Sequence, residues 1–297
     1  MLLRAATRGS ALALWQTNRV AELLAQTNPE VEIETVVVET TGDQNQTTPL
    51  HQMGGQGVFV KEVQAAVLNG RADFAVHSAK DLPAAATPGL VLVAIPERAD
   101  PRDVLVGARW ADLPAGAIIA TGSVRRRAHL AHLRPDLNFA ELRGNIATRL
   151  EKAAGFAAIV MAQAALDRLG LTPAVADVLE PEVLLPQVGQ GALAIECRTD
   201  DAVAATLLAS ISNQESMNTV GAERAFLAEL GAGCDLPIAA HAVMDHGEIL
   251  LTGAMSSFDG TTLLRDSGRS TDGLTLGASL ARCLRDDQGG GALLDQS

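Results

Sequence analysis

Apolar and polar residues alternate along the first third of the chain in two different periods. Residues 10–24 have apolar side chains at helical spacing, and the β-branched run at 31–38 has the composition of a strand. Residues 40–57 are polar and glycine-rich, which is typical of a long functional loop. A second helix is predicted over 58–69, and a short apolar strand over 74–76.

The middle of the chain continues this alternation. A strand is predicted at 90–95, and three strand–helix pairs follow: 118–120 with 124–133, 138–142 with 148–154, and 157–161 with 164–169. Strands that alternate with helices predict a largely parallel sheet covered on both faces.

Two charged or proline-marked segments divide the chain. Residues 96–103 have the character of a linker, and residues 185–191 that of a hinge. We therefore expect the second unit to be inserted between two crossings from the first. The predicted domains are residues 1–96 with 191–210, residues 101–187, and residues 214–297.

The pattern changes after Asn213. A helix at 220–230 precedes strands at 238–243, 249–254 and 262–265, which are separated by hairpin turns, and a last helix covers 274–284. Grouped strands and helices predict a small α+β domain.

Composition narrows the class of protein. The longest apolar runs fall well short of the ~20 residues that cross a bilayer, and the N-terminus lacks the apolar stretch of a secretory signal. We expect a cytoplasmic protein with no membrane association. The three cysteines, Cys197, Cys234 and Cys283, have no Cys-x-x-Cys spacing, which argues against a disulfide framework and a zinc ribbon.

Charge is distributed unevenly. The net charge of −12 disfavours a general nucleic-acid-binding protein. Residues 121–149, however, contain six arginines and only two acidic residues, Asp136 and Glu141. The local field of this segment is positive.

Asp81 is the most informative single residue, because it follows the apolar run 74–76 in a cluster of ionisable side chains. The carboxyl ends of strands are where open α/β sheets bind ligands. Beside Lys80 and His77, Asp81 suits a general acid/base or a group that stabilises a cation. The alternative, a loop carboxylate that only caps a turn or pairs with Lys80, stays open, as does a structural role for His77.

Ser123 is a good N-cap, which places Arg125 and Arg126 in the first turn of a helix. Positive charge there opposes the helix dipole by ~0.3–1 kcal/mol for each side chain. Either an anion binds at this turn or the arginines form a solvated basic face. Arg143, at the end of a predicted strand, favours the anion.

Cys234 lies in a glycine-flanked loop, Gly231-Ala232-Gly233-Cys234-Asp235. A thiolate in such a loop can anchor a ligand, although a lone loop cysteine is more often inert. Cys197 and Cys283 fall in apolar or helical patterns typical of buried thiols. His129 and His132 lack an evident third ligand, so no metal site is predicted.

Eight segments, in order, resemble the porphobilinogen deaminase family. They are Thr7-Arg8-Gly9-Ser10 with 12–16, Gly57-Val58-Phe59 with 60–62, Val76-His77-Ser78-Ala79-Lys80-Asp81 with 82–83, residues 100–103, Leu142-Arg143-Gly144-Asn145, Gly189-Gln190-Gly191-Ala192, residues 222–225, and Gly233-Cys234 with 237–238. The resemblance covers most of the chain.

The resemblance implies a fold and a reaction. The fold is two domains like those of periplasmic binding proteins, with mainly parallel mixed sheets, plus a small third domain with a three-stranded antiparallel sheet. The reaction condenses four molecules of porphobilinogen, with loss of ammonia, on a covalent dipyrromethane cofactor, and hydrolysis then releases hydroxymethylbilane. The competing class is a non-catalytic module that binds a carboxylated ligand with the same two domains.

The resemblance also implies roles for particular residues. The catalytic residues are Asp81 and Lys80. The cofactor-binding residues are Cys234 through a thioether, Lys80, Asp81, Ser123, Arg125, Arg126, Arg149 and Gln190. The substrate-binding residues are Arg8, Ser10, Phe59, Ser78, Arg143 and Arg149. We expect a monomer whose partner is the small-molecule substrate. Gln52 and Gln56 depart from the family, which often has lysines in that loop.

Overall fold

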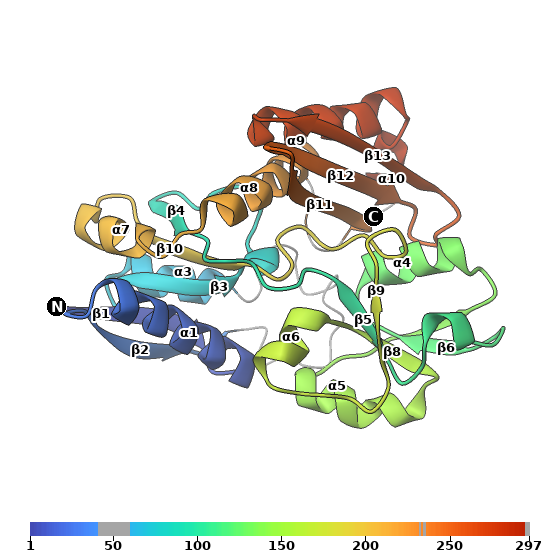
Figure 1. The fold of residues 1–297 in the computed structure, drawn as a ribbon, viewed down its shortest axis with the longest axis horizontal. Helices are drawn as coiled ribbons and strands as arrows, with labels where there is room; N and C mark the ends of the chain where they lie inside the picture. The colour runs from blue at the N-terminus through green and yellow to red at the C-terminus, as the bar shows by residue number, and fades with distance from the viewer. Residues whose placement is uncertain (41–59, 232, 234–235, 295–297) are drawn as a thin grey trace.

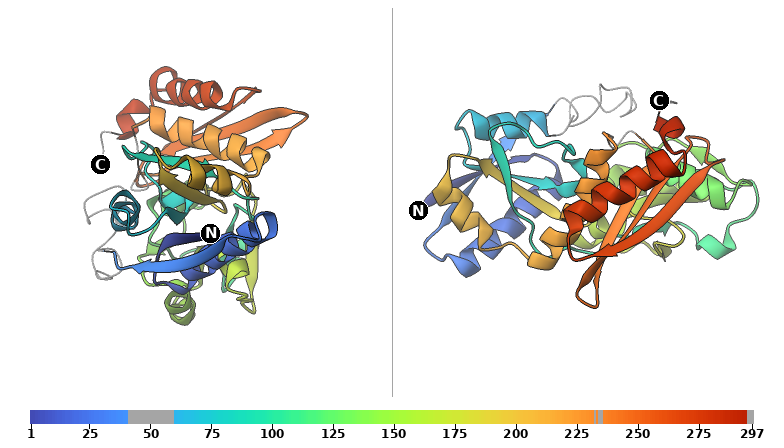
Figure 2. Two further views of the ribbon diagram at one scale, coloured as in Figure 1. Left: turned by 90° about the vertical axis from the view of Figure 1, so that its left-hand side faces the viewer. Right: turned by 90° about the horizontal axis from the view of Figure 1, so that it is seen from above.

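Three sheets organise the chain in the computed structural model, which describes residues 1–40, 60–231, 233 and 236–294 (Figure 1). The third sheet and its helices lie above the other two in Figure 1, and the first side view in Figure 2 shows the same stacking over the first sheet. The predicted loop residues 41–57, with Gln52 and Gln56, fall outside the described part of the chain.

The first sheet has the strand order β2-β1-β3-β10-β4. Its strands are β1 (Leu2–Arg8), β2 (Glu32–Val38), β3 (Phe74–Ser78), β4 (Leu90–Ala94) and β10 (Leu193–Arg198), and its helices are α1 (Ala11–Thr27), α3 (Lys61–Leu68) and α7 (Ala202–Ala209). Leu3, Phe74 and Ile195 are buried from three of the strands and pack with Leu24 of α1. This apolar layer fixes the direction in which the strand ends point.

The second sheet has the order β7-β6-β8-β5-β9. Its strands are β5 (Asp103–Val106), β6 (Ile118–Ala120), β7 (Asn138–Ala140), β8 (Ala158–Ala162) and β9 (Ala176–Leu179), and its helices are α4 (Val124–Leu133), α5 (Ile146–Lys152) and α6 (Gln163–Arg168), with short 3₁₀ turns at Trp110–Asp112 and Ala153–Gly155. Every residue of β8 is buried, as expected for a strand covered on both faces.

Both α/β sheets are mixed, as predicted, but they are less parallel than the alternation of strands and helices indicated. In the first sheet, β1 pairs in parallel with β2 and β3, whereas β10 is antiparallel to β3 and β4. In the second, β5 is antiparallel to β8 and β9. The antiparallel strands β5 and β10 are those that follow the two crossings between the sheets, so each enters its sheet from the opposite end.

The third sheet is an antiparallel meander of β11 (Ile238–Asp245), β12 (Glu248–Ser256) and β13 (Leu263–Ser270). Helices α8 (Gln214–Glu229) and α9 (Gly273–Arg282) bury Phe226, Leu251 and Leu280 against it. A π turn at Cys283–Asp287 and the short α10 (Gly291–Leu294) follow. The predicted fold class is therefore confirmed, whereas the numerical domain boundaries stay a prediction.

A buried carboxylate attaches the third unit to both crossings. Glu223 of α8 is fully buried and accepts a bidentate ion pair from Arg98, with N–O distances of 2.6 and 3.1 Å. It also accepts the backbone N–H groups of Gly189, at 2.7 Å, and Ala242, at 2.8 Å. Arg98 precedes β5 and Gly189 precedes β10, so one side chain holds the two connecting segments together.

Helix α4 of the second unit also contacts the third unit. Arg127 and His132 lie beside the carbonyls of Phe258 and Gly260 in the β12–β13 turn, at 3.4 and 3.0 Å. Gly260 has a φ of +76°, and a Cβ at this position would lie 2.4 Å from the carbonyl oxygen of Ala128. Glycine is therefore required for the turn to approach α4.

This contact predicts the effect of Gly260→Ala. A positive φ costs a side-chain-bearing residue ~1–2 kcal/mol, and the backbone clash adds ~1–3 kcal/mol. Gly247→Ala is the matched control, because Gly247 has a φ of +86° with open space around its Cβ position. In chemical denaturation, Gly260→Ala should lose at least about 1 kcal/mol more unfolding free energy than Gly247→Ala. Equal losses would mean that the turn can move away from α4 at no cost.

Candidate active site

The site begins where β3 of the first sheet ends. The apolar side chains of β3 are buried, and the chain then turns through a 3₁₀ segment, Ala79–Asp81. The backbone N–H of Ala79 donates to the carbonyl of Ala192 at 3.0 Å, which ties this turn to the segment before β10. Asp81 is half-buried at the end of the turn.

Lys80, in the same turn, reaches across to the hinge. Its Nζ donates to Oε1 of Gln190 at 3.2 Å. Burial and the nearby positive charge of Arg126 lower the pKa of Lys80 to about 8, and the carboxylate of Asp81 offsets part of this shift. Lys80 is thus a partly desolvated cation, which strengthens its interaction with any anion that reaches it.

The first turn of α4 is buried rather than solvated. Ser123 caps the helix, with its Oγ accepting from the N–H of Arg126 at 3.4 Å, as the sequence predicted. Arg125 and Arg126 are only 2% and 6% exposed. The interpretation of a solvated basic face is therefore wrong.

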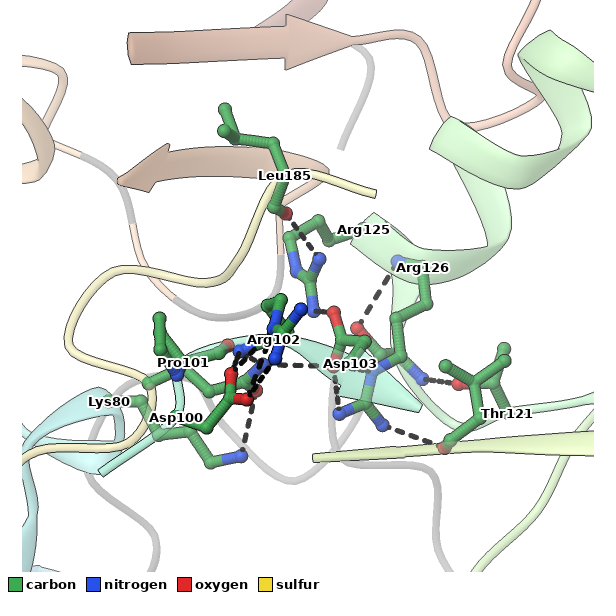
Figure 3. Close-up of polar contacts among 12 residues, drawn as sticks. Lys80, Asp100, Pro101, Arg102, Asp103, Thr121, Arg125, Arg126 and Leu185 are labelled. Carbon is green, nitrogen blue, oxygen red and sulfur yellow. Dashed lines mark hydrogen bonds and ion pairs between the residues drawn. The ribbon is translucent and has the colours of Figure 1, made fainter. Parts of the chain in front are cut away.

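An anion does compensate these arginines, and it belongs to the protein itself (Figure 3). Asp103, the first residue of β5, accepts from Arg125 Nη2 at 2.7 Å and from Nε and Nη2 of Arg126 at 3.0 and 2.7 Å. Burial alone would raise the pKa of Asp103, but the two guanidinium groups outweigh it and hold this pKa at about 2. The carboxylate is ionised and offsets the unfavourable helix dipole.

Each arginine also donates to a backbone carbonyl. Arg125 Nη1 donates to Leu185 at 2.6 Å, and Arg126 Nη1 donates to Val160 at 2.9 Å. The buried Nε–H of Arg125 makes no hydrogen bond within the residues that the structure describes. The Nε–H group of Arg125 is therefore a donor that the described residues leave unpaired.

Arg149 and Arg143 lie on the next loop and helix of the second unit. Asn145 caps α5, and Arg149 Nε donates to the carbonyl of Gly144 at 2.8 Å. Burial, together with the positive charges of Arg126 and Arg143, lowers the pKa of Arg149 to about 10, while Asp81 raises it. Arg149 is therefore influenced by charges of both α/β units, those of Arg126 and Arg143 and that of Asp81.

The first unit carries three more predicted residues, Arg8, Ser10 and Ser78. Arg8 ends β1, Ser10 caps α1 by accepting from the N–H of Ala13 at 3.3 Å, and Ser78 Oγ accepts from Gln16 at 2.9 Å. His77 Nε2 lies 3.2 Å from Glu196 in the buried part of this sheet, which favours its structural interpretation. Phe59 and Cys234 lie outside the described residues.

A cavity lies where the three units meet. It is lined by Ala79, Lys80, Leu82, Ser123, Arg125, Gln187, Val188, Leu227, Gly233, Leu236 and Ile238. Two cations and several apolar side chains face it, and Gly233 immediately precedes Cys234 in the chain. Its lining suits a ligand with an apolar body and carboxylate groups.

Sequence reasoning missed Asp103 and Gln187. Asp103 was assigned to a linker because Asp100-Pro101-Arg102-Asp103 is charged and contains proline. The overlooked signal was the apolar run Val104–Val106, which makes Asp103 the first residue of a buried strand. Gln187, by contrast, carried no signal, because its place in the cavity depends on the path of the hinge.

The arrangement places two cationic side chains, Lys80 and Arg125, on one cavity between two α/β units and a third unit. Two family models match the chain: porphobilinogen deaminase, dipyromethane cofactor binding domain, over residues 3–206, and porphobilinogen deaminase, C-terminal domain, over residues 217–286. The chain belongs to the porphobilinogen deaminase family.

Two individual relatives with high coverage have the same family name. The porphobilinogen deaminase of Pelobacter propionicus is 43% identical over 99% of this chain and 96% of its own length. That of Bacillus pumilus is 44% identical over the same shares. Among solved structures, the methionine-binding protein MetQ aligns with 14% identity over 75% of this chain and 94% of its own, at a TM-score of 0.43.

The environment of Lys80 predicts a particular pH dependence of stability. Its pKa is about 8 in the native protein and is expected to return to its ordinary 10.5 on unfolding. Between these values the unfolded chain binds more protons at this site, so the contribution of Lys80 to stability rises with pH. Lys80→Met should remove a rise of roughly 1–3 kcal/mol between pH 8 and 10.5.

The measurement is the unfolding free energy of wild type and variant across that pH range. Lys61→Met, at an exposed position on α3, serves as the control and should keep the wild-type slope. If the two variants have the same slope, Lys80 is not desolvated in the native state.

Proposed function

We propose that this protein catalyses the head-to-tail condensation of four porphobilinogen molecules and releases hydroxymethylbilane by hydrolysis. Each addition breaks an aminomethyl C–N bond, releases ammonia, forms one C–C bond and returns the α-hydrogen of a pyrrole to solvent as a proton. The observation that carries the proposal is the convergence of Lys80, Arg125 and Gly233 on one cavity in a chain of this family.

The residues fit a dipyrromethane cofactor bound through Cys234. The Nε–H of Arg125 is a buried donor without a hydrogen-bond partner in the described residues, and Lys80 is a partly desolvated cation in the same cavity. Both suit the carboxylates of a pyrrole ligand. When bound, the cofactor supplies the pyrrole carbon on which the chain is extended.

The protein's own groups have distinct proposed roles. Asp81 stabilises positive charge that develops at a pyrrole nitrogen, since a carboxylate fixed near a developing cation lowers the energy of the transition state. Lys80, Ser123, Arg125, Arg126, Arg149 and Gln190 hold the cofactor. Arg8, Ser10, Phe59, Ser78, Arg143 and Arg149 hold the carboxylates of the incoming substrate.

A non-catalytic binding module is the less favoured function, because a binder needs neither Asp81 nor the anchoring thiol of Cys234. None of the helices in the described residues is long and apolar enough to cross a membrane. We further propose a cytoplasmic monomer with domain boundaries at 1–96 with 191–210, 101–187 and 214–297.

The covalent cofactor can be tested by intact-mass measurement of the purified protein. Wild type should carry a mass excess, and Cys234→Ala should lose it because only this thiol forms the thioether. Cys197→Ala and Cys283→Ala are the controls and should keep it. A mass excess that persists in Cys234→Ala would falsify the assignment of this cysteine.

Asp81→Asn should preserve the fold and lose most turnover, because an amide cannot supply the negative charge. By comparison with other preorganised electrostatic groups, the barrier should rise by ~2–4 kcal/mol, a fall in kcat of about 30-fold to 1000-fold. Asp200→Asn removes an exposed carboxylate outside the cavity and should leave kcat unchanged. Near-normal turnover in an Asp81→Asn protein that carries the mass excess would rule out this role.

A further inference from the structure

One buried carboxylate, Asp103, is linked to both cationic residues of the cavity lining: to Arg125 directly and to Lys80 through Gln190. Asp103 is fully buried and accepts four hydrogen bonds: one from Arg125, two from Arg126 and one from Gln190 Nε2 at 2.9 Å. These donors come from α4 and from the hinge before β10. Asp103 itself lies outside the cavity lining and makes its contacts from the second sheet.

The contacts with α4 fix the directions of two guanidinium groups. Arg125 is held between Asp103 and the carbonyl of Leu185, and Arg126 between Asp103 and the carbonyl of Val160. Each planar group is therefore fixed on two sides. In this arrangement the Nε–H of Arg125 has no hydrogen-bond partner among the described residues.

The contact with Gln190 extends the effect to the first unit. The amide nitrogen of Gln190 donates to Asp103 and to the carbonyl of Pro101, at 2.9 and 2.7 Å. Its oxygen must then point the other way, where it accepts from Lys80 Nζ at 3.2 Å. If the amide turned over, two N–H donors would face the ammonium group.

Asp103 balances only part of the positive charge that it contacts. One carboxylate faces Arg125 and Arg126 directly and Lys80 through Gln190, so it orients more positive charge than it neutralises. A ligand with several carboxylates would add negative charge next to these cations. Asp103 thus fixes the orientation of these cations and leaves part of their positive charge for a ligand.

We propose that Asp103 is a positioning residue for the cofactor and substrate carboxylates, acting through Arg125 and Arg126 on one side and through Gln190 and Lys80 on the other. This inference rests on the proposed function. It predicts that removing the charge of Asp103 impairs binding of the carboxylated groups even where the protein stays folded.

The test compares Asp103→Asn with Glu196→Gln. Glu196 is also a buried acid, 6% exposed, and it accepts from Gln64 at 2.8 Å in the first sheet, away from the cavity. Both variants should be less stable. Only Asp103→Asn should show a KM for porphobilinogen raised by about tenfold or more, a smaller change in kcat, and a reduced fraction of molecules with the covalent mass excess.

Crystal structures supply a readout that does not depend on activity. In Asp103→Asn the guanidinium groups of Arg125 and Arg126 should leave their positions, and Gln190 should turn away from Lys80. Unchanged positions, or a KM within about twofold of wild type, would overturn the proposal. A wild-type protein without mass excess or condensation activity would instead refute the proposed function, while the crystallographic comparison would still decide the role of Asp103.

If Asp103→Asn fails to fold, Gln190→Met tests whether Asp103 positions Lys80 through Gln190. It removes the link between Asp103 and Lys80 and keeps the ion pairs of Asp103 with α4. In its crystal structure Lys80 should leave its position while the guanidinium groups stay unmoved, a readout that does not depend on a contact between Gln190 and the cofactor. An unmoved Lys80 in this folded variant would count against the proposal.

Discussion

The ion pairs between Asp103 and the two arginines at the start of α4 are the interaction on which the site depends. A helix that begins with Arg125 and Arg126 is unfavourable by itself, because two positive charges meet the positive end of the helix dipole. Burying them without a partner would cost several kcal/mol for each charge. The carboxylate of Asp103 removes both difficulties, and its hydrogen bonds leave the guanidinium groups few alternative positions. The start of β5 at Asp103 is thus fixed by the two arginines with which this carboxylate pairs.

The same region is where the two crossings between the α/β units run side by side. Arg98 donates to the carbonyl of Gln190 at 2.9 Å, and both segments are fixed to Glu223 of the third unit. If one α/β unit moves against the other, the conformation of these two connecting segments has to change. Since Gln190 also contacts Lys80 and Asp103, such a movement would change the distance between cations on the two sides of the cavity. The geometry of the joint and the geometry of the site are thus coupled.

Local patterns predicted much of the fold, and the limits have a physical cause. Helix α4 was predicted with its observed bounds, because its cap and apolar spacing are local signals. The strands β1, β5 and β10 were not predicted as strands. Arg4 and Glu196 interrupt the apolar runs of β1 and β10, and the run of β5 is short and begins at a charged residue, Asp103. The partners of these charged residues are distant in sequence: Arg4 bonds to Asp73, and Asp103 to Arg125. In the sequence, a charged residue inside a strand has the same pattern as one in a surface loop, because the partner that holds it is far along the chain.

The positive segment 121–149 shows why counting charges was insufficient to define the site. Arg134 pairs with Asp136, Arg127 turns towards the third unit, and Arg125 and Arg126 share Asp103. Asp136 and Asp103 therefore offset only part of the local positive charge. A ligand in this site meets guanidinium groups that already have acceptors in the protein. It gains most by offering several carboxylates at once to donors whose directions are fixed, such as Arg125 Nε, and this favours polycarboxylated pyrroles over simple acids.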